Sequence, residues 1–236
     1  MTQSAKSLFR AMRQKPQIVS GASLPMALPQ QRAPEAARRK HDAYLTAQVE
    51  PIRALLHVDG PRIRACAPVW EPACGEGHLV REIRAYGLPC SASDLIDRGC
   101  PDSWQADYFT CFRSRGDAII TNPPYDKINA RDGHGRWLGH TLAMQDWRYL
   151  ALLLSWDWPA ARANGLGEML DLHPFSYCYL MRWKLDFTGA GSPPQRNAWF
   201  VWDRDDPRSK SGKGPHPEPG FRFLDRHDWR QEALPI

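Results

Sequence analysis

Short apolar runs alternate with helical patterns along the middle of this 236-residue chain. One apolar run ends at Trp70, another spans 117–121 and a longer one spans 148–156, and the segment 89–93 is a further expected strand after the first of them. Runs of this length, bounded by turn residues, predict short buried strands. Strands that alternate with helices are typical of an α/β fold.

Helical patterns and two further runs complete this outline. A helix that ends near Val58 has Pro51 in its first turn, and a second helix ends at Gly87. Residues 136–147 predict a third helix. The runs 176–183 and 197–202 predict the final strands, which we expect to close the sheet as an antiparallel pair.

Composition divides the chain into three parts. Residues 1–40 are rich in Pro, Ala and Gln, lack periodicity, and contain eight Lys or Arg against one acid, Glu35. We expect a flexible basic N-terminal segment there, a globular domain over 41–203 and a C-terminal tail over 204–236. The net charge of +5 therefore belongs to the first segment. Such an arm can follow phosphates, although a solvated tail explains the charge equally well.

Composition also excludes several classes of protein. A hydrophobic content of 42% and ten tryptophans indicate a globular protein. No apolar run reaches the roughly 20 residues that a membrane span needs, and the N-terminus lacks a secretory pattern. Six cysteines occur without a CxxC pair, which argues against a zinc site and favours reduced thiols. We therefore expect a cytoplasmic protein with no metal and no membrane partner.

The clearest candidate chemistry follows the apolar run 117–121, at Asn122-Pro123-Pro124-Tyr125. Two prolines end the strand, and ligands of open α/β sheets lie at such strand ends. The Asn122 amide oxygen and the Pro123 carbonyl can each accept an N–H of a planar amino group. Its lone pair is then held out of plane, and Tyr125 can stack on the group. The alternative is an ordinary Pro-rich turn.

Two acidic positions upstream fit a nucleotide-like ligand. Gly75 and Gly77 lie between the first strand and its helix, where a ligand can approach the backbone. Asp94 ends the second strand, 23 residues after Glu71, a spacing at which nucleotide-binding sheets place an acid for ribose hydroxyls. Asp107 precedes two aromatic residues and could accept from an adenine amino group.

In order, EPACGEG, Asp94, Asp107 and NPPY resemble the motifs of class I methyltransferases that use S-adenosylmethionine. The chain most resembles the phage-like branch that methylates adenine N6 in DNA, over about residues 41–203. The resemblance implies a Rossmann-like, seven-stranded sheet with helices on both faces and the last strand antiparallel. It also implies S-adenosylmethionine as the cofactor, and direct transfer to a flipped or single-stranded adenine.

The resemblance further implies which residues form the site. DAYLT at 42–46 is similar to a segment that closes over the cofactor, and WFVW at 199–202 is placed near the target base. The catalytic residues would be Asn122, Pro123, Pro124 and Tyr125. The cofactor-binding residues would be Tyr44, Thr46, Glu71, Pro72, Ala73, Gly75, Gly77, Asp94, Leu95, Asp107, Tyr108 and Phe109.

Basic residues near the tetrapeptide predict contacts with nucleic acid, which we expect to be DNA. Lys127, Arg131 and Arg136 follow it in a glycine-containing loop, and Arg196 ends a second loop expected at the same edge. A solvated loop is the alternative. Only the stretches 126–147 and 186–196 and the tails remain to recognise a DNA sequence. We therefore expect a short or relaxed recognition sequence. The oligomeric state is left open.

Other functions share part of this pattern. RNA adenine methyltransferases and protein glutamine methyltransferases also have NPPY after a class I core, although the basic segments favour nucleic acid. A non-catalytic nucleic-acid-binding module is disfavoured because Asn122 and the glycine loop are intact. A nicotinamide-dependent enzyme would need a third glycine where Val80 stands.

Overall fold

The computed structural model describes most of the region expected to be globular. All described residues belong to one compact unit that spans His41–Ile236. Three predicted site residues, Tyr44, Thr46 and Arg131, and the basic segment 1–40 lie outside the described residues. The described ranges are 48–128, 136–160, 165–186, 196–210 and 217–226.

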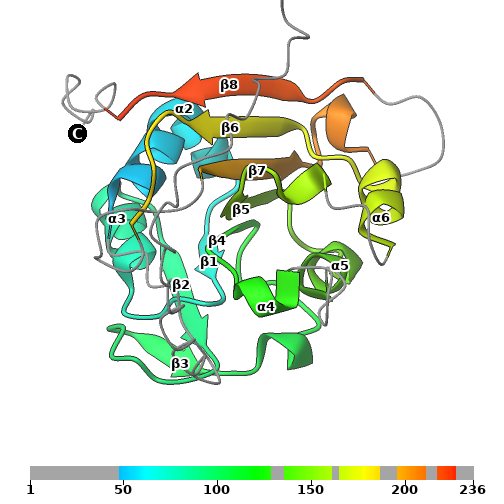
Figure 1. Cartoon of the computed structure of the whole chain (residues 1–236). Helices are drawn as coiled ribbons and strands as arrows, with labels where there is room; N and C mark the ends of the chain where they lie inside the picture. The colour runs from blue at the N-terminus through cyan, green and yellow to red at the C-terminus, as the bar shows by residue number, and fades with distance from the viewer. Residues whose placement is uncertain (1–47, 129–135, 161–164, 187–195, 211–216, 227–236) are drawn as a thin grey trace, which may run out of the picture. The chain divides into compact units, whose positions relative to one another are not determined.

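One eight-stranded sheet organises these residues, in the order β3-β2-β1-β4-β5-β7-β6-β8 (Figure 1). The first five strands are mutually parallel, whereas β7 runs antiparallel to both β5 and β6. The strands are β1 (Val69–Glu71), β2 (Cys90–Asp94), β3 (Ser103–Gln105), β4 (Ala118–Thr121), β5 (Tyr149–Ser155), β6 (Tyr177–Met181), β7 (Asn197–Asp203) and β8 (Gly220–Leu224).

The expected Rossmann-like sheet is confirmed, with its antiparallel strand at β7. The prediction of seven strands was one too few. The eighth strand, β8, lies in the segment expected to be a tail and pairs in parallel with β6, from Tyr177↔Gly220 to Met181↔Leu224. Without β8, the strand β6 would present an unpaired row of N–H and C=O groups at the edge of the sheet.

Helices cover both faces of the sheet, as the resemblance implies. Figure 1 shows α2 (Glu50–Ala65) and α3 (His78–Ala85) on one face. The other face carries α4 (Tyr125–Ile128), α5 (Arg136–Ala143) and α6 (Leu166–Leu172). Each layer encloses its own apolar cluster against the sheet. Because strand residues alternate between the faces, neighbours such as Trp199 and Phe200 belong to different clusters.

The helix α2 continues well beyond Val58, where the sequence predicted its end, and Pro61 lies inside it. Two sets of polar contacts, made by Asp59 and Arg62, bind the second half of α2 to the sheet. Asp59 accepts hydrogen bonds of 2.8 Å from the Tyr149 and Tyr179 hydroxyls. Arg62 forms a two-bond ion pair with Asp203. These contacts offset the helix-breaking tendency of proline.

The parallel direction of β1, β2, β4 and β5 brings their carboxyl ends to one edge of the sheet. The glycine loop leaves β1 there, and the Asn122 tetrapeptide leaves β4 there. This is the edge at which ligands of open α/β sheets bind. Among the described residues, no helix has the length and apolar character to cross a membrane. The same residues contain no group of three or more side chains suited to hold a metal ion.

Candidate active site

A cavity of about 280 Å³ opens at the carboxyl edge of the parallel strands. It is lined by the loops after β1, β2 and β4, by the segment around Tyr108 and by the start of α5. Most of the predicted site residues line this cavity. They are Pro72, Ala73, Gly75, Asp94, Leu95, Asp107, Tyr108, Phe109, Asn122, Pro123, Pro124, Lys127 and Arg136.

The glycine turn and Asp94 are joined directly. Gly75 has a φ of +54°, and its N–H donates a 2.8 Å hydrogen bond to Oδ2 of Asp94. The Ile96 N–H donates to Oδ1 of the same carboxylate at 3.1 Å. A carboxylate has about four lone-pair positions, so Asp94 can still accept further hydrogen bonds from a ligand in the cavity.

Gly77 supports the turn from outside the cavity wall. It precedes α3 with a φ of +80°, a conformation that favours glycine. A Cβ atom at this position would lie 2.6 Å from the Cys100 sulfur. Gly77 therefore permits close packing of the loop after β2 against the glycine turn.

Glu71 lies beneath the loop and does not line the cavity. Its side chain is fully buried at the end of β1, and Oε1 accepts a 3.2 Å hydrogen bond from the Ala73 N–H. Burial raises the pKa of Glu71 to about 8, while the neighbouring Thr121 hydroxyl and the Ala73 N–H oppose this rise. The carboxyl group is therefore largely protonated at neutral pH, and it shapes the loop rather than binding a ligand directly.

An aromatic wall closes one side of the cavity. The Tyr108 ring stacks on Trp137 of α5 with centroids 4.0 Å apart, and its hydroxyl lies 2.6 Å from the Thr141 hydroxyl oxygen. The Arg136 guanidinium lies 4.0 Å from the centroid of the Phe109 ring. This wall offers a planar apolar surface with a cation at its rim.

Asp107 adds a polar group next to the aromatic wall. It caps the short 3-10 helix η1 (Tyr108–Thr110), and its Oδ1 accepts a 2.9 Å hydrogen bond from the Phe109 N–H. Its Oδ2 accepts none from the residues that the structure describes. This oxygen is suited to accept from an amino group that lies against the rings.

The tetrapeptide at 122–125 lies partly in the cavity lining and partly in the protein interior. Asn122, Pro123 and Pro124 line the cavity, whereas Tyr125 begins α4 just outside the lining. The half-buried Tyr125 ring packs against the cluster under α5 and α6. Its hydroxyl accepts a 3.2 Å hydrogen bond from Nδ2 of Asn197 in β7.

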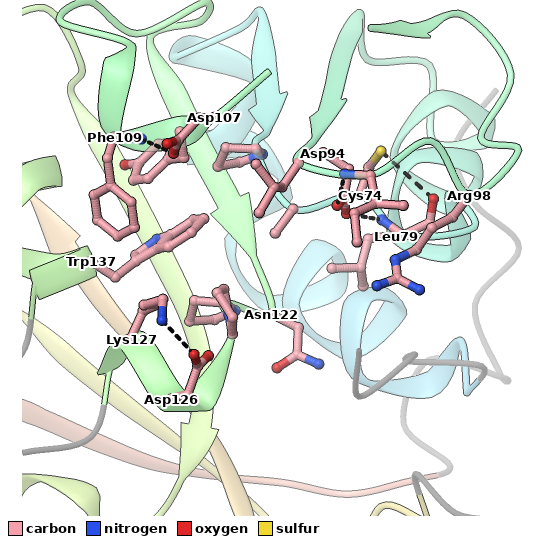
Figure 2. Close-up of a pocket in the computed structure, with 18 of the residues that line it drawn as sticks. Cys74, Leu79, Asp94, Arg98, Asp107, Phe109, Asn122, Asp126, Lys127 and Trp137 are labelled. Carbon is pink, nitrogen blue, oxygen red and sulfur yellow. Dashed lines mark hydrogen bonds and ion pairs between the residues drawn. The ribbon is translucent and has the colours of Figure 1, made fainter. Parts of the chain in front are cut away.

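Figure 2 shows the labelled Asp107, Phe109 and Trp137 side chains together on one side, and Cys74, Leu79 and Arg98 on the other. Lys127 lies in the lining and pairs with Asp126 at 2.6 Å. The remaining predicted nucleic-acid contact, Arg196, is exposed outside the lining and donates to the Arg182 carbonyl at 3.0 Å.

Several lining residues were not predicted from the sequence. Cys74, Leu79, Ile96 and Arg98 lie within four residues of predicted positions, so proximity to the motifs was their available signal. Trp137 adjoins the predicted Arg136, but only the folding of α5 against η1 brings its ring to the aromatic wall. The unpredicted lining residues are Cys74, His78, Leu79, Ile96, Arg98, Asp126 and Trp137.

No family model matches this chain, and no curated protein matches its sequence. Solved structures do match. A type I restriction-modification methyltransferase subunit from Streptococcus thermophilus shows 12% identity and a TM-score of 0.49, over 77% of this chain and 46% of that one. A SAM-dependent methyltransferase from Archaeoglobus fulgidus shows 11% identity and a TM-score of 0.44, over 66% and 94%. This chain thus spans about half of the restriction-modification subunit, and matches at this level assign no activity.

Proposed function

We propose that this protein is an S-adenosylmethionine-dependent methyltransferase that methylates the N6 amino group of adenine in DNA. The observation that carries the proposal is that predicted cofactor-binding residues and predicted catalytic residues line one cavity. The glycine turn, Asp94 and Asp107 line the same cavity as Asn122, Pro123 and Pro124. A cofactor site and an amino-acceptor site must share one edge of the sheet for methyl transfer to occur.

The residues present fit the cofactor by their chemistry. Asp94 is anchored by two backbone N–H groups and retains lone pairs for ribose hydroxyls. The Oδ2 atom of Asp107 and the rings of Phe109 and Trp137 suit an adenine ring and its amino group. Bound S-adenosylmethionine would supply an electrophilic methyl group on a positively charged sulfur.

The role of the tetrapeptide is to orient the acceptor. The Asn122 amide oxygen and the Pro123 carbonyl can each accept one N–H of a planar amino group, which turns its lone pair out of the plane. Pro123 and Pro124 restrict the backbone, so this pair of acceptors is preorganised. No base is required before transfer, because the alkylated nitrogen is acidic and loses its proton readily.

The choice of acceptor rests on charge. The segment 1–40 carries eight basic residues against one acid, and Lys127 and Arg136 lie in the cavity wall. A polyanion fits these cations better than a protein amide does. RNA adenine is the second candidate, because the same groups would orient its amino nitrogen.

Incubation of the full-length protein with cofactor labelled on the methyl group, and with DNA, RNA or a protein extract, tests the proposal. Digestion of the labelled DNA to nucleosides should yield N6-methyladenine. Label confined to RNA or to protein would overturn the choice of DNA. A wild-type protein that binds the cofactor but labels none of the three pools would overturn methyl transfer to an amino nitrogen.

A further inference from the structure

The amide of Asn197 touches the catalytic tetrapeptide from a strand far away in the sequence. Asn197 is the first residue of β7, and it is fully buried. Its Nδ2 donates to the Tyr125 hydroxyl at 3.2 Å and to the Leu154 carbonyl at 3.4 Å. One side chain therefore connects Tyr125 to the two strands β5 and β7.

The orientation of this amide follows from its partners. The Leu154 carbonyl can only accept a hydrogen bond, so the amide atom facing it must be the nitrogen. The Tyr125 hydroxyl is then the acceptor of the second N–H. Asn197 lies opposite Ser155 in the ladder between β7 and β5, so the donor has a fixed position.

Fold stability alone does not explain Asn197. Its Oδ1 atom is buried and accepts no hydrogen bond from any residue that the structure describes. A buried amide with an unsatisfied oxygen costs stability, and an apolar side chain would avoid this cost. Such a group in a native protein calls for another explanation, and a role in a functional site is one recognised explanation.

Tyr125 also needs an anchor of this kind. It begins α4, a helix of only four residues, and it directly follows the two prolines that line the cavity. Its ring packs on the apolar cluster under α5 and α6, and apolar packing of this kind is not directional. The hydrogen bond to its hydroxyl fixes the far end of the ring relative to the sheet.

We propose that Asn197 is a positioning residue, which holds Tyr125 at the start of α4 and thereby keeps the adjoining Asn122-Pro123-Pro124 turn in the orientation needed for the acceptor. This proposal rests on the proposed function and deepens it. Asn197 would act through Tyr125 and would contact neither the cofactor nor the acceptor. Its loss should therefore lower the rate of methyl transfer and leave cofactor binding unchanged.

A double-mutant cycle tests this role in the full-length protein. Asn197→Ala, Tyr125→Phe and the double variant are assayed for kcat and KM on an adenine-containing single-stranded DNA oligonucleotide, and for cofactor affinity by calorimetry. Each single variant should lower kcat about tenfold with cofactor affinity within about twofold. The double variant should be no slower than either single variant, because both remove the same hydrogen bond.

Two controls separate positioning from structure. Tyr179→Phe also removes a buried tyrosine hydroxyl, one that donates to Asp59 on α2, and it should lower the melting temperature without changing kcat. Asn197→Gln retains an amide N–H that can donate to the Tyr125 hydroxyl, and it should recover part of the lost kcat relative to Asn197→Ala.

The outcomes are distinct. Multiplicative losses in the double variant, or loss of cofactor binding in Asn197→Ala, would overturn the positioning role while leaving the proposed function intact. A fall in melting temperature with unchanged kcat in Asn197→Ala would also overturn it. If the wild-type protein transfers no methyl group to adenine, the proposed function fails first, and the role of Asn197 in that reaction fails with it.

Discussion

Some of the predicted site residues at the edge of the sheet line the cavity, whereas others support the loop that forms it. Asp94 and Asn122 line the cavity, whereas Glu71 and Gly77 lie behind the loop that forms its wall. The motifs and the family resemblance together predicted all four as site residues. They could not separate the two groups, since the direction of a side chain at a strand end depends on how the following loop packs.

The buried carboxyl of Glu71 makes stability depend on pH. Its pKa is raised to about 8 in the folded protein by burial, from about 4.5. The stabilising contribution is therefore fully present below about pH 4.5 and is lost as the pH rises through about 8. Relative to Glu71→Gln, the wild-type free energy of unfolding should fall by on the order of a few kcal/mol across this window.

Denaturant unfolding at a series of pH values measures this difference. Glu71→Gln keeps an oxygen for the Ala73 N–H and removes the ionisable group, so it isolates the titration. Wild-type and variant curves that run parallel from pH 4 to pH 8.5 would show that Glu71 titrates normally in the folded protein.

Elements differ in how well the sequence predicted them. The strands β1, β4 and β5 were found because each is a buried, largely apolar run in a parallel sheet, whereas β2 was found from its place between the helix after the glycine loop and Asp94. The edge strands β3 and β8 were missed, since most of their residues are at least partly exposed and lack that signal. Both form strands by pairing with a neighbour distant in the sequence, a non-local effect that local patterns do not reveal.

The turn between β1 and α3 should tolerate no side chain at Gly77. Gly77→Ala should destabilise the protein by about 1 to 3 kcal/mol, because the Cβ strains a left-handed residue and also meets the Cys100 sulfur. Gly87→Ala is the matched control, since Gly87 has the same φ of +80° with no atom within 4 Å of the Cβ position. It should cost only about 1 to 2 kcal/mol, from backbone strain.

Chemical denaturation of both variants gives the comparison, and cofactor titration extends it. We expect Gly77→Ala to weaken cofactor binding as well, because the shifted turn carries Gly75 and its bond to Asp94. Equal destabilisation by the two substitutions would show that Cys100 does not pack against Gly77.

For the molecule as a whole, the uneven distribution of charge bears on DNA binding. The eight basic residues of segment 1–40 account for the positive net charge, since the rest of the chain has 23 basic and 25 acidic residues. Sequence composition located this asymmetry directly. The sequence predicted Tyr108 and Phe109 as site residues but not Trp137, because Trp137 meets Tyr108 only after α5 has packed on η1.

If the basic segment follows DNA phosphates, replacing Arg38, Arg39 and Lys40 by Gln should weaken binding at low salt. The slope of log affinity against log salt should become shallower by about one for each phosphate that the variant no longer neutralises. Fluorescence anisotropy with a labelled duplex, in a salt series, measures this slope. Arg113→Gln, an exposed change before the amino end of β4, is the control and should leave the slope unchanged. A slope unaffected by the triple substitution would identify the segment as a solvated tail.

The central claim, that the glycine turn and Asn122 form the two halves of one methyl-transfer site, is tested most directly by measuring cofactor affinity and transfer rate on the same variants. Asn122→Ala should lower the rate about 100-fold or more, with a cofactor Kd within about threefold of wild type. Asp94→Ala should raise the cofactor Kd about tenfold or more. Loss of cofactor binding in Asn122→Ala, together with unchanged binding in Asp94→Ala, would contradict the account.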